Sequence, residues 1–420
     1  MKRFFCLALV AVVMGAVFCA GMKGVQPAAK SIEGTALACT LDSIVNAAVA
    51  VQDIPGAVLC IVEGDQVIYE KAYGYRQVYP TPEPMTTNTI FDLASLSKVV
   101  GTGMTAMSLV EEGLLDLDAT VSTYLPEYEG DATIRDLMTH VSGLPAYAQW
   151  KTLLDGQRAD TPSHPLLTSL DLSEQAPFRE QKRRILLNHV CHCPRLSTPR
   201  TEFRYSCLNF ITLQYVMETI TGKPLNQLAE ERVFAPLGMT HTGYSPQMDN
   251  GRWALQDNPD VAPTELQADS TCLHGIVHDP LARIMNSGVS GNAGVFSTAG
   301  DLAKLAKWML KTLSDSPSLG GEGKSGGPFC RETLAMMVTI PEGYEAFGRA
   351  LAWDVDSDYS GCKGDYASPQ VVCHTGYTGT QMVVDLEKNI AIILLTHRVH
   401  PYDDGAVGPT RRAVADAVLR

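Results

Sequence analysis

The sequence lacks any concentration of positive charge. Its 420 residues include 33 lysines and arginines against 46 aspartates and glutamates, which gives a net charge of -13. The basic residues are spread along the chain and form no cluster. Proteins that bind nucleic acid usually carry a basic patch, so we expect no nucleic-acid partner.

The chain also lacks a hydrophobic run that could span a bilayer. The apolar run at residues 4–18 follows two basic residues and precedes small ones, and a spanning helix needs about 20 apolar residues. This pattern is typical of a secretory signal peptide. We therefore expect a signal peptide over 1–21, a polar tether over 22–36 and export to the periplasm. Contact with a membrane is expected only if Cys19 carries a lipid anchor.

Cysteine is present but without regular spacing. Of the eleven cysteines, nine follow the predicted signal peptide, and their irregular spacing excludes a disulfide-rich scaffold. Export permits a disulfide, but the spacing selects no pair. The run HVCHCP (189–194) crowds two histidines and two cysteines. Residues this close rarely converge on one metal ion, so we expect a surface loop and no metal.

Nucleotide and cofactor motifs are absent as well. No glycine-rich dinucleotide motif follows a predicted strand. Gly323-Lys324-Ser325 resembles the end of a phosphate-binding loop, but Ser318 stands where the first glycine of that motif is needed. We read residues 314–328 as a surface loop and expect no cofactor.

Local patterns predict a sheet built from both ends of the chain. Apolar β-branched runs flank short turns at 57–76 and 381–399, and each pair reads as a hairpin. Residues 148–200 read as a loop. Helical periodicity and glycine stop signals predict helices over 95–112, 208–221, 302–313 and 409–420.

A serine and a lysine begin the first of these helices. In Ser95-Leu96-Ser97-Lys98, residues three apart share a helix face, so Ser95 and not Ser97 can lie beside the Lys98 amine. A serine hydroxyl becomes a nucleophile when a base takes its proton, and a buried lysine can be that base. Alone, the pattern is weak and favours a capped helix with an exposed lysine.

Two further fragments carry the residues that such chemistry would need. Tyr205, in EFRYSCLNF (202–210), could pass a proton between nucleophile and leaving group. In CHTGYTGT (373–380), backbone N–H groups at the start of a strand could hold an oxyanion. Each fragment alone also fits a turn with a packed aromatic residue.

Histidines offer a second, weaker mechanism. HGIVHDP (274–280) carries His274, His278 and Asp279, which with a serine would suggest a triad. The Gly-x-Ser-x-Gly elbow is absent from the sequence, which disfavours that mechanism. We expect His140 to fix a turn.

In this order and combination, the three fragments resemble those of the serine β-lactamase and penicillin-binding-protein superfamily, nearest its class C and esterase-like branch. The connecting segments 109–128, 133–147 and 288–310 resemble it too, and the resemblance covers roughly residues 40 to 420. It implies an α+β fold, an antiparallel sheet flanked by helices with a mostly helical second lobe. We expect one domain over 37–420, with a sheet lobe at about 37–112 and 285–420 and a helical lobe at about 113–284.

The resemblance also implies roles for the motif residues. Ser95 would be the acylated nucleophile, Lys98 its base partner and Tyr205 the proton shuttle. The backbone N–H groups of Ser95 and Tyr377 would form the oxyanion hole. The substrate would be bound along Cys207, His374, Thr375 and Gly376.

Two positions depart from the family pattern. Cys207 stands where the family usually has an asparagine that contacts the substrate amide, and a thiol is a poor hydrogen-bond partner. His374 replaces a frequent lysine and would be mostly neutral at pH 7. Both changes weaken the case for efficient β-lactam hydrolysis and fit a hydrolase of esters or small peptides better.

The sequence therefore predicts an exported serine hydrolase that works through an acyl-enzyme. Its substrate would be an ester, a D-amino-acid peptide of the peptidoglycan type or a β-lactam. The alternative is a protein of the same fold that binds penicillin or cell wall with slow or no turnover, and Cys207 favours it.

Overall fold

The computed structural model describes residues 31–158, 176–314 and 326–420. The predicted signal peptide, most of the predicted tether and the Gly323–Ser325 run lie outside these ranges. Within them, every helix is too short or too polar to cross a membrane.

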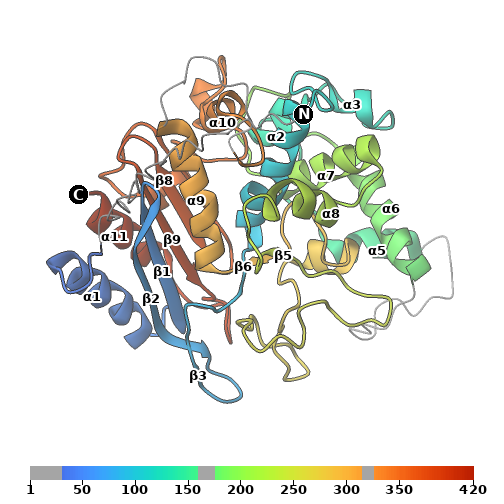
Figure 1. The fold of residues 1–420 in the computed structure, drawn as a ribbon. Coiled ribbons are helices and arrows are strands. Elements are labelled where there is room, and N and C mark those ends of the chain that lie inside the picture. The colour runs from blue at the N-terminus through green and yellow to red at the C-terminus, as the bar shows by residue number, and fades with distance from the viewer. Residues whose placement is uncertain (1–30, 159–175, 315–325) are drawn as a thin grey trace, which may run out of the picture.

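A six-stranded sheet joins the two ends of the described chain (Figure 1). Its order is β3-β2-β1-β9-β8-β7, and each adjacent pair is antiparallel. The two predicted hairpins are confirmed as β1–β2 and β8–β9, and β1 pairs with β9 at the centre of the sheet. The strands are β1 (Gly56–Glu63), β2 (Gln66–Gln77), β3 (Glu83–Pro84), β7 (Val371–Thr375), β8 (Gln381–Asp385) and β9 (Ile390–Thr396).

Helices cover both faces of this sheet (Figure 1). Helix α9 (Ala299–Ser314) packs on one face of β1 and β9, whereas α1 (Ala36–Ala50) and α11 (Gly408–Leu419) pack together on the other. Successive strand residues point to opposite faces, so alternate residues of one strand enter different hydrophobic clusters. Val372 belongs to the α9 side and Cys373 to the α1 and α11 side.

Most other helices form a second lobe beside the sheet (Figure 1). Among them, α7 (Cys207–Thr221) ends at Gly222 in the left-handed conformation, as its sequence predicts. The remaining helices are α2 (Met104–Glu111), α3 (Val121–Tyr124), α4 (Ile134–Met138), α5 (Trp150–Arg158), α6 (Ala176–His192), α8 (Leu225–Ala229) and α10 (Arg331–Val338).

Two loop expectations are wrong where the structure describes them. Helices α5 and α6 occupy much of the predicted loop at 148–200. The HVCHCP run begins inside α6, where Cys191 is buried and exposed His192 hydrogen-bonds the helix backbone at Asn188. The cluster is therefore the end of a helix whose cysteine side chains pack into the interior, and not a loop. The described residues contain no group of three side chains that could hold a metal ion.

The predicted helix over 95–112 has three parts of different pitch. A 3₁₀ turn (Ala94–Leu96) leads into a π-helical segment (Lys98–Gly103), and α2 completes the run before Gly113. The turn follows β4 (Phe91–Asp92), which pairs with β6 (Val295–Ser297) in a small sheet completed by β5 (Gly243–Tyr244). Such irregular pitch is frequent at functional sites.

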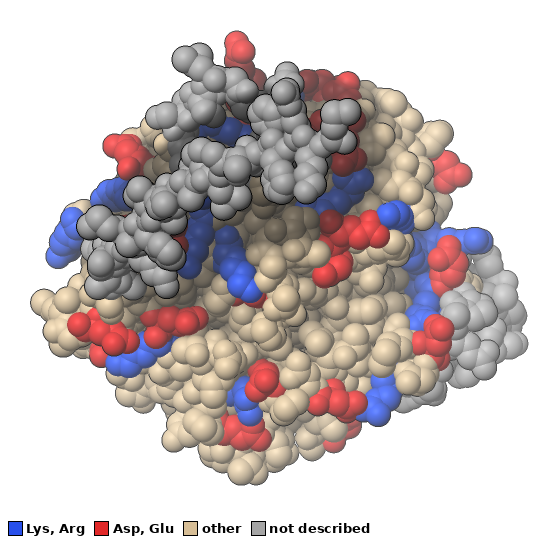
Figure 2. All heavy atoms as spheres, in the orientation of Figure 1, with Lys and Arg blue, Asp and Glu red and all other residues tan. Residues whose placement is uncertain are grey.

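Acidic and basic side chains are interspersed on the face shown in Figure 2. Many are paired across elements, as in the ion pair of Arg232 with Glu112 at 2.8 Å. Surface pairs of this kind contribute little to stability individually.

Candidate active site

Ser95 lies on a tight turn between the small sheet and the π-helical segment. The residue before it, Ala94, has a φ of 46°, a left-handed conformation that costs energy for a residue with a Cβ. The buried Asp92 carboxylate holds the turn by accepting the Ala94 N–H at 2.8 Å. Ser97 is buried and accepts the Val295 N–H at 3.0 Å. Ser97 is therefore structural, and Ser95 is the serine that lines the cleft.

Lys98 is fully buried, and its ammonium group has three hydrogen-bond acceptors. Its Nζ donates to Ser95 Oγ at 3.0 Å, to the Asn292 carbonyl at 2.9 Å and to Cys207 Sγ at 3.5 Å. An ammonium carries three N–H donors, so the arrangement matches a protonated lysine. The side chain lies where the sequence places it, three residues from Ser95 on the same face.

Opposing effects act on the pKa of Lys98. Burial lowers this pKa, and electrostatic interaction with Cys207 and Tyr205 raises it by more, so that it lies above its ordinary value. Proton transfer in this site therefore belongs to Lys98 together with its neighbours, because the amine alone is a poor base while it is charged.

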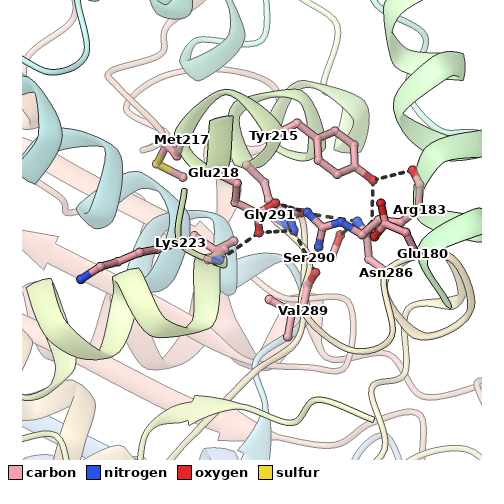
Figure 3. A network of polar contacts seen from close by, with 12 residues as sticks. Glu180, Arg183, Tyr215, Met217, Glu218, Lys223, Asn286, Val289, Ser290 and Gly291 are labelled. Carbon is pink, nitrogen blue, oxygen red and sulfur yellow. Dashed lines mark hydrogen bonds and ion pairs between the residues drawn. The ribbon is translucent and has the colours of Figure 1, made fainter. Parts of the chain in front are cut away.

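A buried polar network, shown around Val289, Ser290 and Gly291 in Figure 3, holds the segment that ends at the carbonyl that Lys98 contacts. The segment 289–292 is bound by Gln214 of α7, whose amide accepts the Gly291 N–H at 2.8 Å and donates to Val289 O at 3.0 Å. Asn286 donates to Ser290 Oγ at 2.9 Å, and Ser290 donates to Asn292 Oδ1 at 2.7 Å. Both ends of the segment are thus held by hydrogen bonds, which fixes the Asn292 carbonyl that accepts from Lys98.

Tyr205 is held between aromatic rings at the mouth of the site. Its ring lies 4.4 Å from that of His140 and stacks on Tyr359 at 5.1 Å. The Lys98 Nζ lies 5.1 Å from its ring centroid. These contacts leave the phenol half-buried beside Lys98 and lining the same cleft as Ser95.

His140 supports Tyr205 and does not face the substrate. It is fully buried with a φ of 62°, and its Nδ1 accepts the Ser206 N–H at 3.1 Å. Burial and the nearby cations Arg349 and Lys98 hold the pKa of His140 well below its ordinary value. A neutral ring can accept this hydrogen bond, which fixes the start of α7 next to Tyr205.

The third motif docks directly onto the turn that carries Ser95. Thr378 Oγ1 donates to Asp92 O at 2.7 Å, and Thr380 Oγ1 donates to Leu93 O at 2.9 Å. A Cβ on Gly376 would lie 2.2 Å from Leu93 O, so only glycine permits this approach. Two segments far apart in sequence thereby bring Ser95 and Tyr377 to one cleft.

His374 lines this cleft as an uncharged residue. Burial, followed by the charges of Arg349 and Lys98, holds its pKa well below the ordinary value. Where Nδ1–H donates to Thr375 O at 2.9 Å, Nε2 is an acceptor, and it has no hydrogen-bond partner among the described residues. His374 therefore adds no positive charge to the wall of the cleft.

Arginines supply the positive charge of the cleft. Its volume is about 250 Å³, and Arg349, Arg398 and Arg411 line it together with the motif residues. Arg349 is paired with Asp354 at 2.7 Å and Arg398 with Asp403 at 2.6 Å.

Arg411 differs from the other two cleft arginines in its lack of a carboxylate partner among the described residues. Its Nη2 donates to Gly376 O and Thr380 O, both at 2.8 Å, and the described residues offer it no carboxylate within ion-pair distance. Burial lowers the pKa of Arg411 to about 10, so the side chain stays charged at neutral pH. It is a cation available to an anionic group in the cleft.

The HGIVHDP segment lies beside the cleft without lining it. His278 stacks on Tyr377 with 5.8 Å between ring centroids and lies 3.3 Å from Glu265. His274 contacts Gln256 O at 2.8 Å. Neither histidine forms the serine triad that the sequence suggests as a weaker alternative, because both contact other residues.

Sequence comparison shows which family the chain belongs to. The family model described as Beta-lactamase matches residues 41–417. The chain belongs to the β-lactamase family. Relatives named "Putative D-alanyl-D-alanine carboxypeptidase" from Escherichia coli O157:H7 and Salmonella gallinarum are both 30% identical to it. Their alignments span 376 and 386 residues, 82% and 84% of this chain and 79% and 82% of theirs. The chain is thus a β-lactamase-fold member of a family of serine hydrolases.

Solved structures of β-lactamase-fold proteins confirm the predicted α+β architecture. EstCE1, a hydrolase with promiscuous acyltransferase activity, has a TM-score of 0.65 at 24% identity over 91% of this chain and 98% of its own. An octameric penicillin-binding-protein homologue from Pyrococcus abyssi has a TM-score of 0.64 at 22% identity, covering 91% and 77% of the two chains. Simvastatin synthase from Aspergillus terreus has a TM-score of 0.62 at 20% identity, covering 92% and 98%.

Several residues of this site have no signal in the sequence. Asn292 contributes a backbone carbonyl, which any residue could supply. Arg349 and Arg411 lie far from the motifs along the chain. Tyr359 follows a segment without a recognisable pattern. The segment 288–310 supports the family resemblance, but its contact with Lys98 is visible only in the structure.

Proposed function

We propose that the protein is an exported serine hydrolase that acts through an acyl-enzyme formed on Ser95. The observation that carries the proposal is the 3.0 Å hydrogen bond from Lys98 Nζ to Ser95 Oγ at the wall of an open cleft. A buried, oriented lysine that contacts a cleft-facing serine matches an activated nucleophile. Export rests on the N-terminal sequence pattern alone.

The first step moves one proton and forms one bond. Ser95 Oγ attacks the substrate carbonyl. Its proton passes to the Lys98–Tyr205 pair, which can accept it when the pair holds one proton fewer than in its fully protonated form. The same pair then protonates the leaving group as the bond between the carbonyl carbon and that group breaks. Water attacks the acyl-enzyme in the second step, returns the proton by the same route and releases the acid.

The oxyanion would bind to the backbone N–H groups of Ser95 and Tyr377. The contacts of Thr378 and Thr380 with Asp92 and Leu93 fix these two segments relative to each other. Donors that are already in place cost little reorganisation when the charge develops.

The cleft favours a substrate with a free carboxylate. Arg411 offers a buried cation without an acidic partner in the described chain, whereas Asp354 and Asp403 compensate the charges of Arg349 and Arg398. A guanidinium binds a carboxylate through paired hydrogen bonds. Together with the carboxypeptidase names of the relatives, this supports a D-alanyl-D-alanine peptide of the peptidoglycan type as substrate.

Ester hydrolysis is the second candidate, and Cys207 and His374 favour it. The Cys207 thiol is already engaged by Lys98 and offers a substrate amide little. The neutral His374 adds no charge for a carboxylate. Esters need no amide contact and no leaving-group amine, so they demand less of this site.

Intact-mass measurement tests the acyl-enzyme. The protein is incubated with a fluorophosphonate and, separately, with a penicillin, beside Ser95→Ala. One adduct that is lost in the variant places the nucleophile at Ser95. A penicillin adduct that persists indicates a penicillin-binding type, and one that forms and clears indicates a β-lactamase. No adduct with either reagent would overturn the proposal in favour of the non-catalytic binding protein.

Arg411→Met tests the substrate class. We expect KM for release of D-alanine from a D-alanyl-D-alanine peptide to rise roughly tenfold or more. KM for a neutral ester should stay the same. Arg412→Met is the matched control, because Arg412 is exposed and paired with Asp365. An equal rise in KM for both substrates would show that Arg411 only stabilises the turn between Gly376 and Thr380.

A further inference from the structure

Two thiols meet behind the wall of the cleft. Cys373 precedes His374 on β7, so the two side chains point to opposite faces of the sheet. Cys373 is fully buried in the cluster formed with α1 and α11, and Cys362 is buried in the same cluster. Both are free cysteines in the structure.

Cys362 is brought to this point by a short 3₁₀ turn, Ser360–Lys363. The Cys373 sulfur lies 4.0 Å from Ser360 O in that turn. The Cys362 carbonyl accepts a hydrogen bond from Gln381 Nε2 at 3.0 Å, which binds the turn to the strand beside Cys373. The turn that carries Cys362 therefore packs directly against the strand that carries Cys373.

We infer that Cys362 and Cys373 form a disulfide when the protein folds in an oxidising environment. The proposed export would supply such an environment, whereas the proposed catalysis does not depend on it. With oxidised glutathione as the oxidant, the thiolate of one cysteine attacks the glutathione disulfide and releases one glutathione. The second thiol then displaces the other glutathione, so two thiols are oxidised and one disulfide is reduced.

The timing of this reaction follows from the burial of the pair. The hydrogen bond with Cys362, and then burial, raise the pKa of the Cys373 thiol well above its ordinary value. Only the thiolate attacks a disulfide, so oxidation is fast in the unfolded chain and slow after folding. Once formed, the bond would be shielded from reductants because both sulfurs lie in the buried cluster.

The bridge would hold the aromatic side of the site in place. Tyr359 directly precedes the turn and stacks on Tyr205, whereas His374 directly follows Cys373. A covalent link between these segments fixes the distance between Tyr205's stacking partner and the substrate strand. A disulfide would therefore restrain the positions of residues that line the cleft, although it does not itself line the cleft.

Peptide mapping of the unmodified full chain tests the inference. The protein is refolded with oxidised and reduced glutathione, unfolded at low pH, alkylated and digested without reduction. We expect a linked peptide pair that contains Cys362 and Cys373, and two fewer alkylated cysteines than in the reduced sample. Reduced native protein should gain the bridge much more slowly than protein refolded with the same reagent.

The Cys362→Ser and Cys373→Ser variants complete the experiment. Each should lose the linked peptide, and Cys272→Ser, outside the pair, should keep it. Full alkylation of both cysteines after oxidative refolding would overturn the inference, as would a linked peptide that joins either one to another cysteine. Because this readout does not involve turnover, its outcome is separate from the test of acylation at Ser95.

Discussion

Gln214 connects the body of the helical lobe to the segment that positions Lys98. It is fully buried on α7 and makes four polar contacts through one amide group. It donates to Val289 O at 3.0 Å and to Glu218 Oε1 at 3.2 Å, and it accepts from the Gly291 N–H at 2.8 Å and from Asn286 Nδ2 at 3.4 Å. Replacing it by leucine keeps most of its volume and removes every one of these bonds.

The cost of Gln214→Leu can be worked out from the groups left behind. The Gly291 N–H and the Val289 carbonyl would lose their partner in the interior, and each unpaired buried group costs about 1–3 kcal/mol. The free energy of unfolding should therefore fall by about 2–6 kcal/mol. An apolar side chain among polar groups recovers little of that loss.

Activity should fall as well, because the same segment ends at the Asn292 carbonyl that orients Lys98. A displacement of about 1 Å in a catalytic group can reduce the rate about 100-fold. We expect kcat on a reporter ester to fall by roughly this factor, with KM little changed, since Gln214 does not line the cleft.

Urea denaturation followed by fluorescence measures the first effect, and steady-state kinetics measures the second. Gln227→Leu is the matched control, because Gln227 is exposed and its amide contacts only Glu231 on the surface. Its unfolding free energy should change by less than about 0.5 kcal/mol. If Gln214→Leu and Gln227→Leu are equally stable and active, the network does not position Lys98.

Two other expectations concern the third motif. Because the pKa of His374 is held well below its ordinary value, the ring stays neutral from pH 6 upwards, and kcat/KM should show no histidine titration near pH 6.5; a step there that His374→Gln removes would refute this. Gly376→Ala should reduce kcat/KM about 100-fold, because the new Cβ would meet Leu93 O and Thr380 Oγ1 at 2.2 Å. Gly361→Ala, whose Cβ would meet nothing within 4 Å, should keep full activity in the same assay.

Local patterns in the sequence predict those parts of the fold that neighbouring residues determine. The hairpins around Gly64 and Asn389 follow from alternating β-branched runs and from turn residues that accept a positive φ. The end of α7 follows from Gly222. The three motif residues Ser95, Lys98 and Tyr205 have a specific order and spacing in the sequence, and the structure places buried Lys98 beside both Ser95 and Tyr205 at the cleft.

The features that the sequence does not predict depend on distant packing. Helix α6 reads as a loop because its polar and apolar residues show no clear helical period, yet it packs against α7. The π-helical pitch at Lys98 has no local sequence signal. Arg411 reaches the cleft only because α11 returns to the sheet near β9, and a guanidinium on a terminal helix otherwise reads as a solvated charge.

The pairing of β1 with β9 also determines when the cleft is first complete. These central strands come from opposite ends of the described chain, so their contact has a very long sequence separation, which slows folding. The cleft needs Ser95 from one part and the Thr375–Tyr377 segment from the other. On the proposed mechanism, a chain that is still being synthesised cannot be acylated, so labelling of Ser95 by a fluorophosphonate would report that folding is complete.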